Sequence, residues 1–310
     1  MSAEVETMFY TREKPWHGLG TQVQEAPSSK EALALAGLDW KVIQKKLTTC
    51  DGIPIPGFKA NLRETDNRVL GVVTDRYTVV QNEDAFAFTD ALLGEGITYE
   101  TAGSLQNGRR TWILAKLPQR YIISGDEITP YLVFMNAHDG AGAIKAAMTP
   151  IRVVCMNTLN LALDTAKRSW STNHVGDIQG KLEDARYTLL YADKYMTELG
   201  KAVDRLNHQK LSERQVCEYI DALFPMVNNA SELQKKNLMR MKENVRARFY
   251  DAPDLQHVGK NAYRFVNAVS DFATHAKPLR ERAGYRENLF ARTVEGNALI
   301  DKAYSIVQAA

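Results

Sequence analysis

The 310-residue sequence lacks the features that mark several classes of protein. Its 19 glycines and 10 prolines are too few for a collagen-like or low-complexity chain. Hydrophobic residues make up 45% and charged residues 25%, which excludes a wholly disordered chain. The three cysteines, Cys50, Cys155 and Cys217, lie far apart, and no CxxC or His/Cys ligand spacing exists. A disulfide framework and a structural zinc site are therefore not expected.

Long apolar runs and the common catalytic motifs are missing as well. No stretch approaches the roughly 18 apolar residues of a membrane-spanning helix. Residues 1–6 contain two acids and no apolar run, so they do not resemble a secretory signal. GxxxxGK[ST], HExxH and GxSxG are absent, and Gly18-Leu19-Gly20 lacks the third glycine of a dinucleotide-binding loop. We therefore expect a cytoplasmic protein with no membrane contact, and assign it no catalytic residues, metal or cofactor.

The pattern along the chain predicts an α+β fold, with an antiparallel sheet region followed by a helical region. In residues 1–171, a capping box at Ser28-x-x-Glu31 opens a short helix, and Asn82 opens another that ends near Gly94. Strands are expected at 38–48, 58–63, 68–74, 99–106, 109–117, 131–137 and 143–148. Thr149-Pro150 is typical of an N-cap and first helical position.

Residues 172–310 form the predicted helical region. Apolar residues from Ile178 to Leu206 recur at the spacing of one long amphipathic helix. Ser212 and Ser231 open two further helices, the first ending before Pro225. The last two are expected at 261–276 and 288–308.

Asn107-Gly108 predicts a β-hairpin, because these residues tolerate the positive φ angles of a type I′ turn. A two-residue loop pairs Leu105 with Arg110, Gly103 with Trp112 and Tyr99 with Lys116. One face of the hairpin would then carry Tyr99, Leu105, Arg110, Trp112 and Lys116. Such a face could stack bases and neutralise phosphates, with Arg109 beside the turn. Alternatively, Trp112 and Tyr99 belong to the core and the cations lie at its edge.

The net charge of +2 conceals an uneven distribution. Residues 1–44 carry −2, residues 45–166 carry −1 and residues 167–310 carry +5. The predicted helix at 235–248 contains six cations and only one acid, Glu243. Among them, Lys235, Lys236 and Arg240 could follow a phosphate backbone, although a solvated face is the commoner explanation of such a run of cations.

Three further candidates carry weaker signals. Arg152, in the first turn of a predicted helix, could hold a phosphate or carboxylate, or form a salt bridge to the sheet. A Cys155–His138 nucleophile pair can be drawn, but nothing in the sequence orients the base. A metal site formed by His17, His138 and Asp139 lacks ligand spacing.

Several strings together resemble a known family. They are Pro15-Trp16-His17-Gly18-Leu19-Gly20, Asp75-Arg76-Tyr77-Thr78-Val79-Val80-Gln81-Asn82, Asn136-Ala137-His138-Asp139-Gly140 and residues 149–159, which include Asn157. The resemblance is to the phage/plasmid-like family called domain of unknown function 932, and extends from Trp16 to about Val307. It implies a gene carried on phages or plasmids. It supplies no activity and no established site residues.

Three hypotheses follow. The first is a non-enzymatic protein that binds single-stranded DNA or RNA in recombination or annealing. Phage single-strand annealing proteins have a similar order of strands and helices. Because such proteins commonly form rings, a homo-oligomer is expected. The second is an interaction protein that binds a host factor, which would expose an apolar or acidic patch. The third is an enzyme acting on nucleotides through a cleft near His138, Asp139, Arg152 and Asn157.

Overall fold

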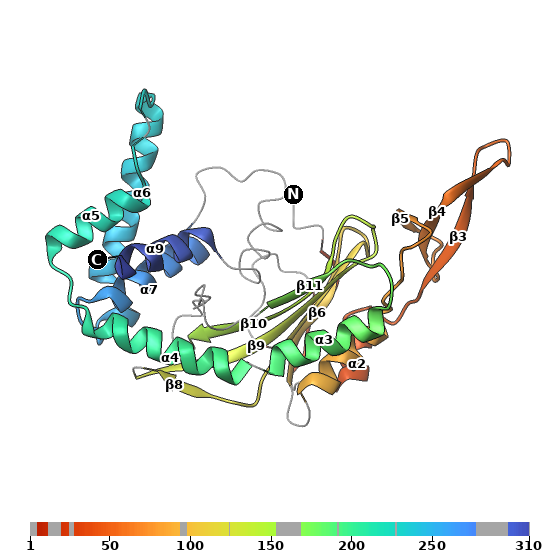
Figure 1. The fold of residues 1–310 in the computed structure, drawn as a ribbon, viewed down its shortest axis with the longest axis horizontal. Helices are drawn as coiled ribbons and strands as arrows, with labels where there is room; N and C mark the ends of the chain where they lie inside the picture. The colour runs from red at the N-terminus through yellow and green to blue at the C-terminus, as the bar shows by residue number, and fades with distance from the viewer. Residues whose placement is uncertain are drawn as a thin grey trace. The chain divides into compact units, whose positions relative to one another are not determined.

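A computed structural model describes residues 5–11, 20–24, 28–93, 98–123, 125–152, 169–190, 192–226, 228–276 and 297–309. It confirms the α+β class, with mostly antiparallel sheets in the N-terminal half and helices in the C-terminal region (Figure 1). The chain divides into two compact units. Unit 1 comprises Met1–Gln119, Pro130–Met148 and Lys167–Ala192; unit 2 comprises Arg120–Thr129, Thr149–Ala166 and Asp193–Ala310. The boundary expected between residues 171 and 172 stays a prediction.

The larger sheet has the strand order β11-β10-β9-β7-β6-β1-β2, with β8 paired to β9. Its neighbours are antiparallel where register is assigned, except β1 and β2, which run parallel. The strands are β1 (Val5–Tyr10), β2 (Thr21–Gln22), β6 (Thr98–Leu105), β7 (Arg110–Lys116), β8 (Tyr121–Ile123), β9 (Asp126–Ala137), β10 (Ile144–Arg152) and β11 (Ser169–Thr172).

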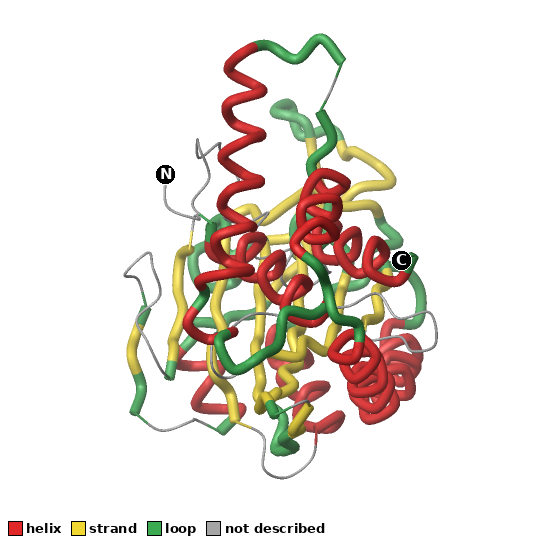
Figure 2. Tube along the Cα trace, turned by 90° about the vertical axis from the view of Figure 1, so that its left-hand side faces the viewer, coloured by secondary structure: helices red, strands yellow, loops and turns green. Residues whose placement is uncertain are grey.

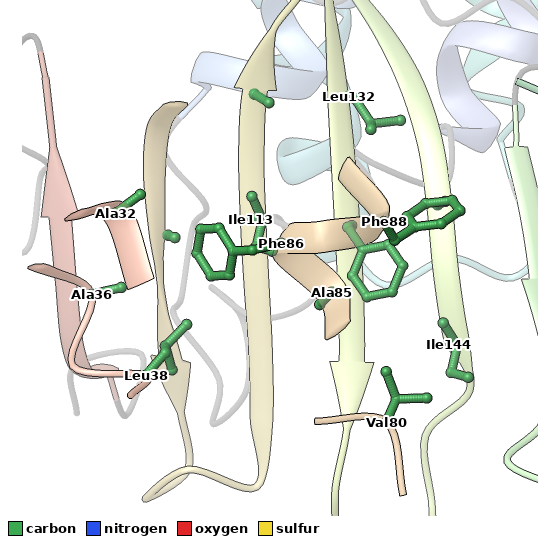
Figure 3. Close-up of a cluster of buried hydrophobic side chains, with 14 of the residues drawn as sticks. Ala32, Ala36, Leu38, Val80, Ala85, Phe86, Phe88, Ile113, Leu132 and Ile144 are labelled. Carbon is green, nitrogen blue, oxygen red and sulfur yellow. The ribbon is translucent and has the colours of Figure 1, made fainter. Parts of the chain in front are cut away.

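Three helices of unit 1 supply apolar side chains to the core on one face of this sheet. They are α1 (Ser29–Leu35), α2 (Asn82–Leu93) and α3 (Ile178–Leu190). Figure 3 shows Phe86 and Phe88 of α2 beside Ile113 of β7 and Leu132 of β9. The predicted capping box of α1 is confirmed, since Ser28 and Glu31 bond each other's backbone N–H.

A separate three-stranded sheet in unit 1 is formed by β3 (Val42–Thr48), β4 (Pro54–Arg63) and β5 (Val69–Thr74). It lies directly against the turn between β9 and β10, because the side chain of Asn61 donates to the carbonyl of His138 at 2.9 Å. Gly71 makes this approach possible, since a Cβ there would lie 2.5 Å from the carbonyl oxygen of Asp139. The sequence predicted β4 and β5, but missed that β4 begins at Pro54 and forms a long ribbon with β3.

Unit 2 contains α4 (Ala192–His208), α5 (Glu213–Leu223), α6 (Glu232–Asp251), the short 3₁₀ helix η1 (Pro253–Leu255), α7 (Ala262–His275) and α9 (Ala298–Gln308). Helix α7 packs against α6 and α9, and α5 against α6 and α9. The predicted starts of α5 and α6 at Ser212 and Ser231 are confirmed as complete capping boxes. In the described part of the chain no helix is long and apolar enough to cross a bilayer.

The predicted start of one helix and the predicted length of another were wrong; residues 153–162 of the first lie outside the described residues. Strand β10 continues through Thr149 and Pro150 to Arg152, because pairing beside β9 overrides the local cap signal. The Thr149 hydroxyl is buried and has no hydrogen-bond partner among the described residues, so it caps nothing there. The long helix expected from Ile178 to Leu206 is two helices, α3 and α4, which belong largely to different units. Their packing partners differ, and apolar periodicity alone does not reveal that change.

The hairpin of β6 and β7 has the predicted turn but only part of the predicted register. Asn107 and Gly108 have the predicted positive φ angles, 58° and 85°, but Gln106 has a positive φ of 53° too, and the turn extends over residues 106–109. Leu105 pairs with Arg110 and Gly103 with Trp112, as expected. A bulge at Glu100 then shifts the register, so Tyr99 pairs with Ala115 rather than Lys116. Tyr99 therefore lies on the opposite face from Trp112, and the single face predicted for both was wrong.

Candidate functional site

A set of buried polar side chains lies in unit 1, where the start of α2 meets the turn between β9 and β10. Asn82 is the first residue of α2, Asn136 lies near the end of β9, and His138 begins the turn. All three are buried. Tyr77, between β5 and α2, donates to the carbonyl of Ala137 at 2.6 Å. We call these residues, together with Gln81, Asp139 and His174, the polar cluster.

Side-chain amides join this cluster to the backbone around it. Asn82 donates to the carbonyl oxygens of Leu38 and Trp40, at 3.0 and 3.4 Å. Asn136 donates to the carbonyl of Val80 at 2.9 Å. Gln81 accepts from the N–H of Val42 at 2.9 Å and donates to its carbonyl at 3.0 Å, as a neighbouring strand would.

His138 is fully buried, and its protonation follows from its partners. Its Nε2 lies 3.1 Å from Oδ1 of Asn82. The amide nitrogen of Asn82 is already donating to two carbonyls, so Oδ1 accepts and Nε2 of His138 carries the proton. Nδ1 is then a bare lone pair, buried and without a hydrogen-bond partner among the described residues. Burial lowers the pKa of His138 to about 3, and nearby His174 acts in the same direction.

His174 follows β11 and repeats this arrangement. Its ring stacks on Tyr77 with centroids 4.5 Å apart. Nδ1 lies 3.1 Å from the carbonyl of Thr78 and therefore carries the proton, so Nε2 is the bare nitrogen. Nε2 is also buried without a hydrogen-bond partner in the described part of the chain. Burial lowers the pKa of His174 and raises that of Tyr77.

Asp139 fixes the turn that carries His138. Its Oδ1 accepts from the N–H groups of Ala141 and Gly142 at 2.8 and 3.1 Å. Its Oδ2 lies 3.6 Å from Nε of Arg110. The negative charge of Asp139 raises the pKa values of His138 and His174, which partly opposes the lowering caused by burial. The turn residues Asp139 and Gly140 therefore serve the backbone conformation, as turn chemistry predicts.

The chemistry available to the polar cluster is limited. Two neutral imidazoles present lone pairs, which can accept hydrogen bonds from a small buried donor such as water. No group of three His, Cys, Asp or Glu side chains that could hold a metal exists among the described residues. A base with a pKa near 3 and no solvent exposure is poorly matched to proton transfer near neutral pH. The geometry favours a structural role in joining the two sheets of unit 1.

The hairpin residues predicted to bind nucleic acid are dispersed. Tyr99 is 2% exposed and donates to Asp90 at 2.5 Å within the core, where its ring packs on Phe86. Trp112 is 6% exposed on the other face of the sheet. Arg109 is exposed at the turn, and Arg110 and Lys116 are half-buried. Both aromatic rings are buried, so they do not form the open aromatic face that was expected. Contacts of Arg109, Arg110 and Lys116 with nucleic acid stay a prediction.

Helix α6 exposes the three cations predicted to follow a phosphate backbone, Lys235, Lys236 and Arg240. Every residue from 231 to 236 is exposed, and the first buried residue of the helix is Val245. Lys235 pairs with Glu232 at 2.7 Å, but no ion pair is found for Lys236 or Arg240 among the described residues. Figures 1 and 2 show the N-terminal half of α6 extending past the other helices of unit 2. We call this half, Glu232–Arg240, the α6 arm.

An acidic cavity lies along the C-terminal half of α6. With η1 and α7 this half of the helix lines an open cavity of about 610 Å³. Arg248 is paired with Asp271 there, and three more acids line the same cavity: Glu243, Asp251 and Asp254. Arg240 lies at the border between this acidic cavity and the α6 arm.

Some sequence candidates fall outside the described residues: Trp16, His17, Cys155, Asn157 and the side chain of Arg152. The nucleophile pair, the three-residue metal site and the cleft that depend on them stay predictions. His174 and Asn82 were not predicted to belong to such a cluster. A histidine in a polar loop gives no sequence signal of burial, whereas Asn82 was identified only as a helix start.

Comparison with known proteins gives one result. The family model described as Domain of unknown function (DUF932) matches residues 69–303, which include every described member of the polar cluster and the α6 arm. No curated protein and no solved structure matches the chain.

Proposed function

We propose that this protein, which belongs to the DUF932 family, binds single-stranded nucleic acid through the α6 arm and does so without catalysis. The observation that carries the proposal is the pair Lys236 and Arg240. They lie one turn apart on one side of the helix, both exposed, and have no acidic partner among the described residues. A pair of cations at this spacing can contact successive phosphates of a flexible strand.

Apolar side chains beside these cations suit unstacked bases. Leu233 and Met239 are 69% and 60% exposed on the same arm, three residues to either side of Lys236. Single-strand binders commonly combine cations with aromatic rings on which bases stack, and here Leu233 and Met239 offer an apolar, non-aromatic surface in that place. The acidic cavity along the rest of α6 would repel phosphates and confine the strand to the arm. Lys235 contributes less, since Glu232 already neutralises it.

A salt titration with matched variants tests the proposal. We expect a labelled 30-nucleotide strand to bind at micromolar protein and low salt, with affinity falling as salt rises. K236Q/R240Q should reduce the slope of log K against log salt by about 1.4, from about 0.7 per single-strand phosphate contact. The control K201Q/R214Q removes the same charge from two exposed cations of unit 2 that already have acidic partners, and should leave the slope unchanged.

Absence of binding in low salt, or equal slopes for the two double variants, would overturn the proposal. A homo-oligomer, including a ring, remains part of it, and sizing of the protein with and without the strand measures that state.

Binding to a host protein is a second candidate, favoured by one observation. The face of the small sheet that points away from Asp139 exposes Phe58, Val69 and Val72 at 46%, 51% and 55%. Exposed apolar side chains grouped on adjacent strands are typical of interaction sites. Retention of a host protein after nuclease treatment, together with no affinity for oligonucleotides, would favour this function over the first.

A further inference from the structure

The ribbon of β3 and β4 in unit 1 ends in an ordered tip that is entirely exposed. Every residue from 48 to 58 is exposed, and Figure 1 shows the ribbon extending past β5. Thr49 closes the tip, because its N–H donates to the carbonyl of Ile53 and its hydroxyl accepts from the N–H of Ile53, at 2.8 and 3.1 Å. Gly52, with φ of 82°, completes the turn. The tip is therefore preformed rather than ordered by whatever it contacts.

Apolar residues and prolines form this tip. Ile53 and Ile55 are 61% and 39% exposed, and they alternate with Pro54 and Pro56. Burial of an apolar side chain such as Ile53 is favourable, so leaving it exposed favours a partner that covers it. Prolines at strand edges block the addition of another strand. The tip is thus built for insertion rather than for extension of the sheet.

Behind the tip, lysines of adjacent strands face each other. Lys46 pairs directly with Lys59 in the β3–β4 register, an arrangement of like charges that destabilises a sheet. Lys45 and Lys59 donate to the neutral amides of Asn67 and Gln44 rather than to carboxylates. Between Lys45 and Lys59 the only acid in the sequence is Asp51. An anionic ligand would relieve the repulsion between the two lysines.

This combination selects one class of partner. Protein interfaces are depleted of lysine and enriched in aromatic residues and arginine, whereas the ribbon tip has lysines behind it and aliphatic residues on it. Proteins that bind the minor groove commonly insert Ile, Leu, Met or Pro between base pairs while cations neutralise the backbone. We propose that the β3–β4 ribbon binds double-stranded DNA, with Ile53 and Ile55 entering the minor groove and Lys45, Lys46 and Lys59 contacting phosphates.

The β3–β4 ribbon belongs to unit 1 and is proposed to bind duplex DNA, whereas the α6 arm belongs to unit 2 and is proposed to bind single strands. Either proposal can therefore fail without the other. The first test measures binding of a labelled 30-base-pair DNA duplex. K46Q/K59Q should reduce the slope of log K against log salt by about 1.8, from about 0.9 per phosphate contact. K236Q/R240Q should leave this duplex slope unchanged.

The second test separates insertion from simple electrostatics. Insertion of Ile53 should unstack 2-aminopurine placed in the duplex and raise its fluorescence at least twofold. I53A/I55A should abolish that rise, whereas the control V69A/V72A, which alters exposed apolar residues of the same sheet, should retain it. Exposed Cys50 at the tip gives an independent readout. Its alkylation should slow at least fivefold with duplex present, while that of Cys217 on α5 should not change.

No duplex binding at micromolar protein and low salt would overturn the inference. So would binding that I53A/I55A and K46Q/K59Q both leave unaltered, or a tip whose Cys50 is protected by a host protein and not by DNA.

Discussion

The burial of His138 predicts how the free energy of unfolding depends on pH. Its pKa is about 3 in the folded protein and about 6.5 in an unfolded chain, because the folded state leaves no room to hydrate a charged ring. Protonation therefore favours the unfolded state. The stability from keeping His138 neutral is present in full above about pH 6.5, and is lost progressively as the pH falls toward 3.

The size of the effect follows from that difference in pKa. Each pH unit within the window changes the free energy of unfolding by about 1.4 kcal/mol for one proton. At pH 5 the loss from His138 is about 2 kcal/mol, at pH 3 it is about 4 kcal/mol, and below pH 3 it approaches its limit of about 5 kcal/mol. His174 adds a loss of the same sign, since burial lowers its pKa too.

Urea denaturation of the wild type and of H138Q at pH 7.5 and pH 5.0 measures this contribution. Glutamine retains a donor toward Oδ1 of Asn82 but cannot be protonated, so the variant should lose about 2 kcal/mol less between the two pH values. H208Q, which removes an exposed histidine on α4, should behave like the wild type. Equal pH dependence in H138Q and wild type, or an NMR titration of His138 near pH 6.5, would refute the reasoning.

Two further substitutions test the junction of the sheets in unit 1. G71A places a Cβ 2.5 Å from the carbonyl oxygen of Asp139 and should lower the free energy of unfolding by about 1–3 kcal/mol in urea denaturation. The control is G200A on α4, where a Cβ meets no atom within 4 Å. This variant should raise the free energy of unfolding by up to about 1 kcal/mol. Q81A removes both hydrogen bonds to Val42 and should accelerate amide exchange at Val42, with a loss of about 1–3 kcal/mol; unchanged exchange at Val42 would show that the Gln81 amide is dispensable.

Local signals were sufficient where the determining residues are close in sequence. Ser28 with Glu31, Ser212 with Gln215 and Ser231 with Gln234 each form a capping box, because every partner lies within one turn. Asn107-Gly108 specified its turn for the same reason. The bulge at Glu100 has no comparable signal, and it alone moved Tyr99 to the other side of the sheet.

The candidate sites divide in the same way. The exposure of Lys236 and Arg240 follows from the polar composition of their own helix. The polar cluster does not, because Tyr77, Asn136 and His174 come from segments separated by more than thirty residues, and only the finished sheet brings them together. Thr149-Pro150 shows the converse error, in which a valid local cap signal was overruled by strand pairing.

The double hydrogen bond between Gln81 and Val42 has a consequence for how unit 1 opens. A side chain here occupies the position of a strand and links the first residue of β3 to the start of α2. Breaking the small sheet away from the rest of unit 1 then requires loosening the start of α2, where Asn82 also holds His138. The small sheet and α2 should therefore exchange their amide hydrogens as one cooperative unit, with a common free energy of opening.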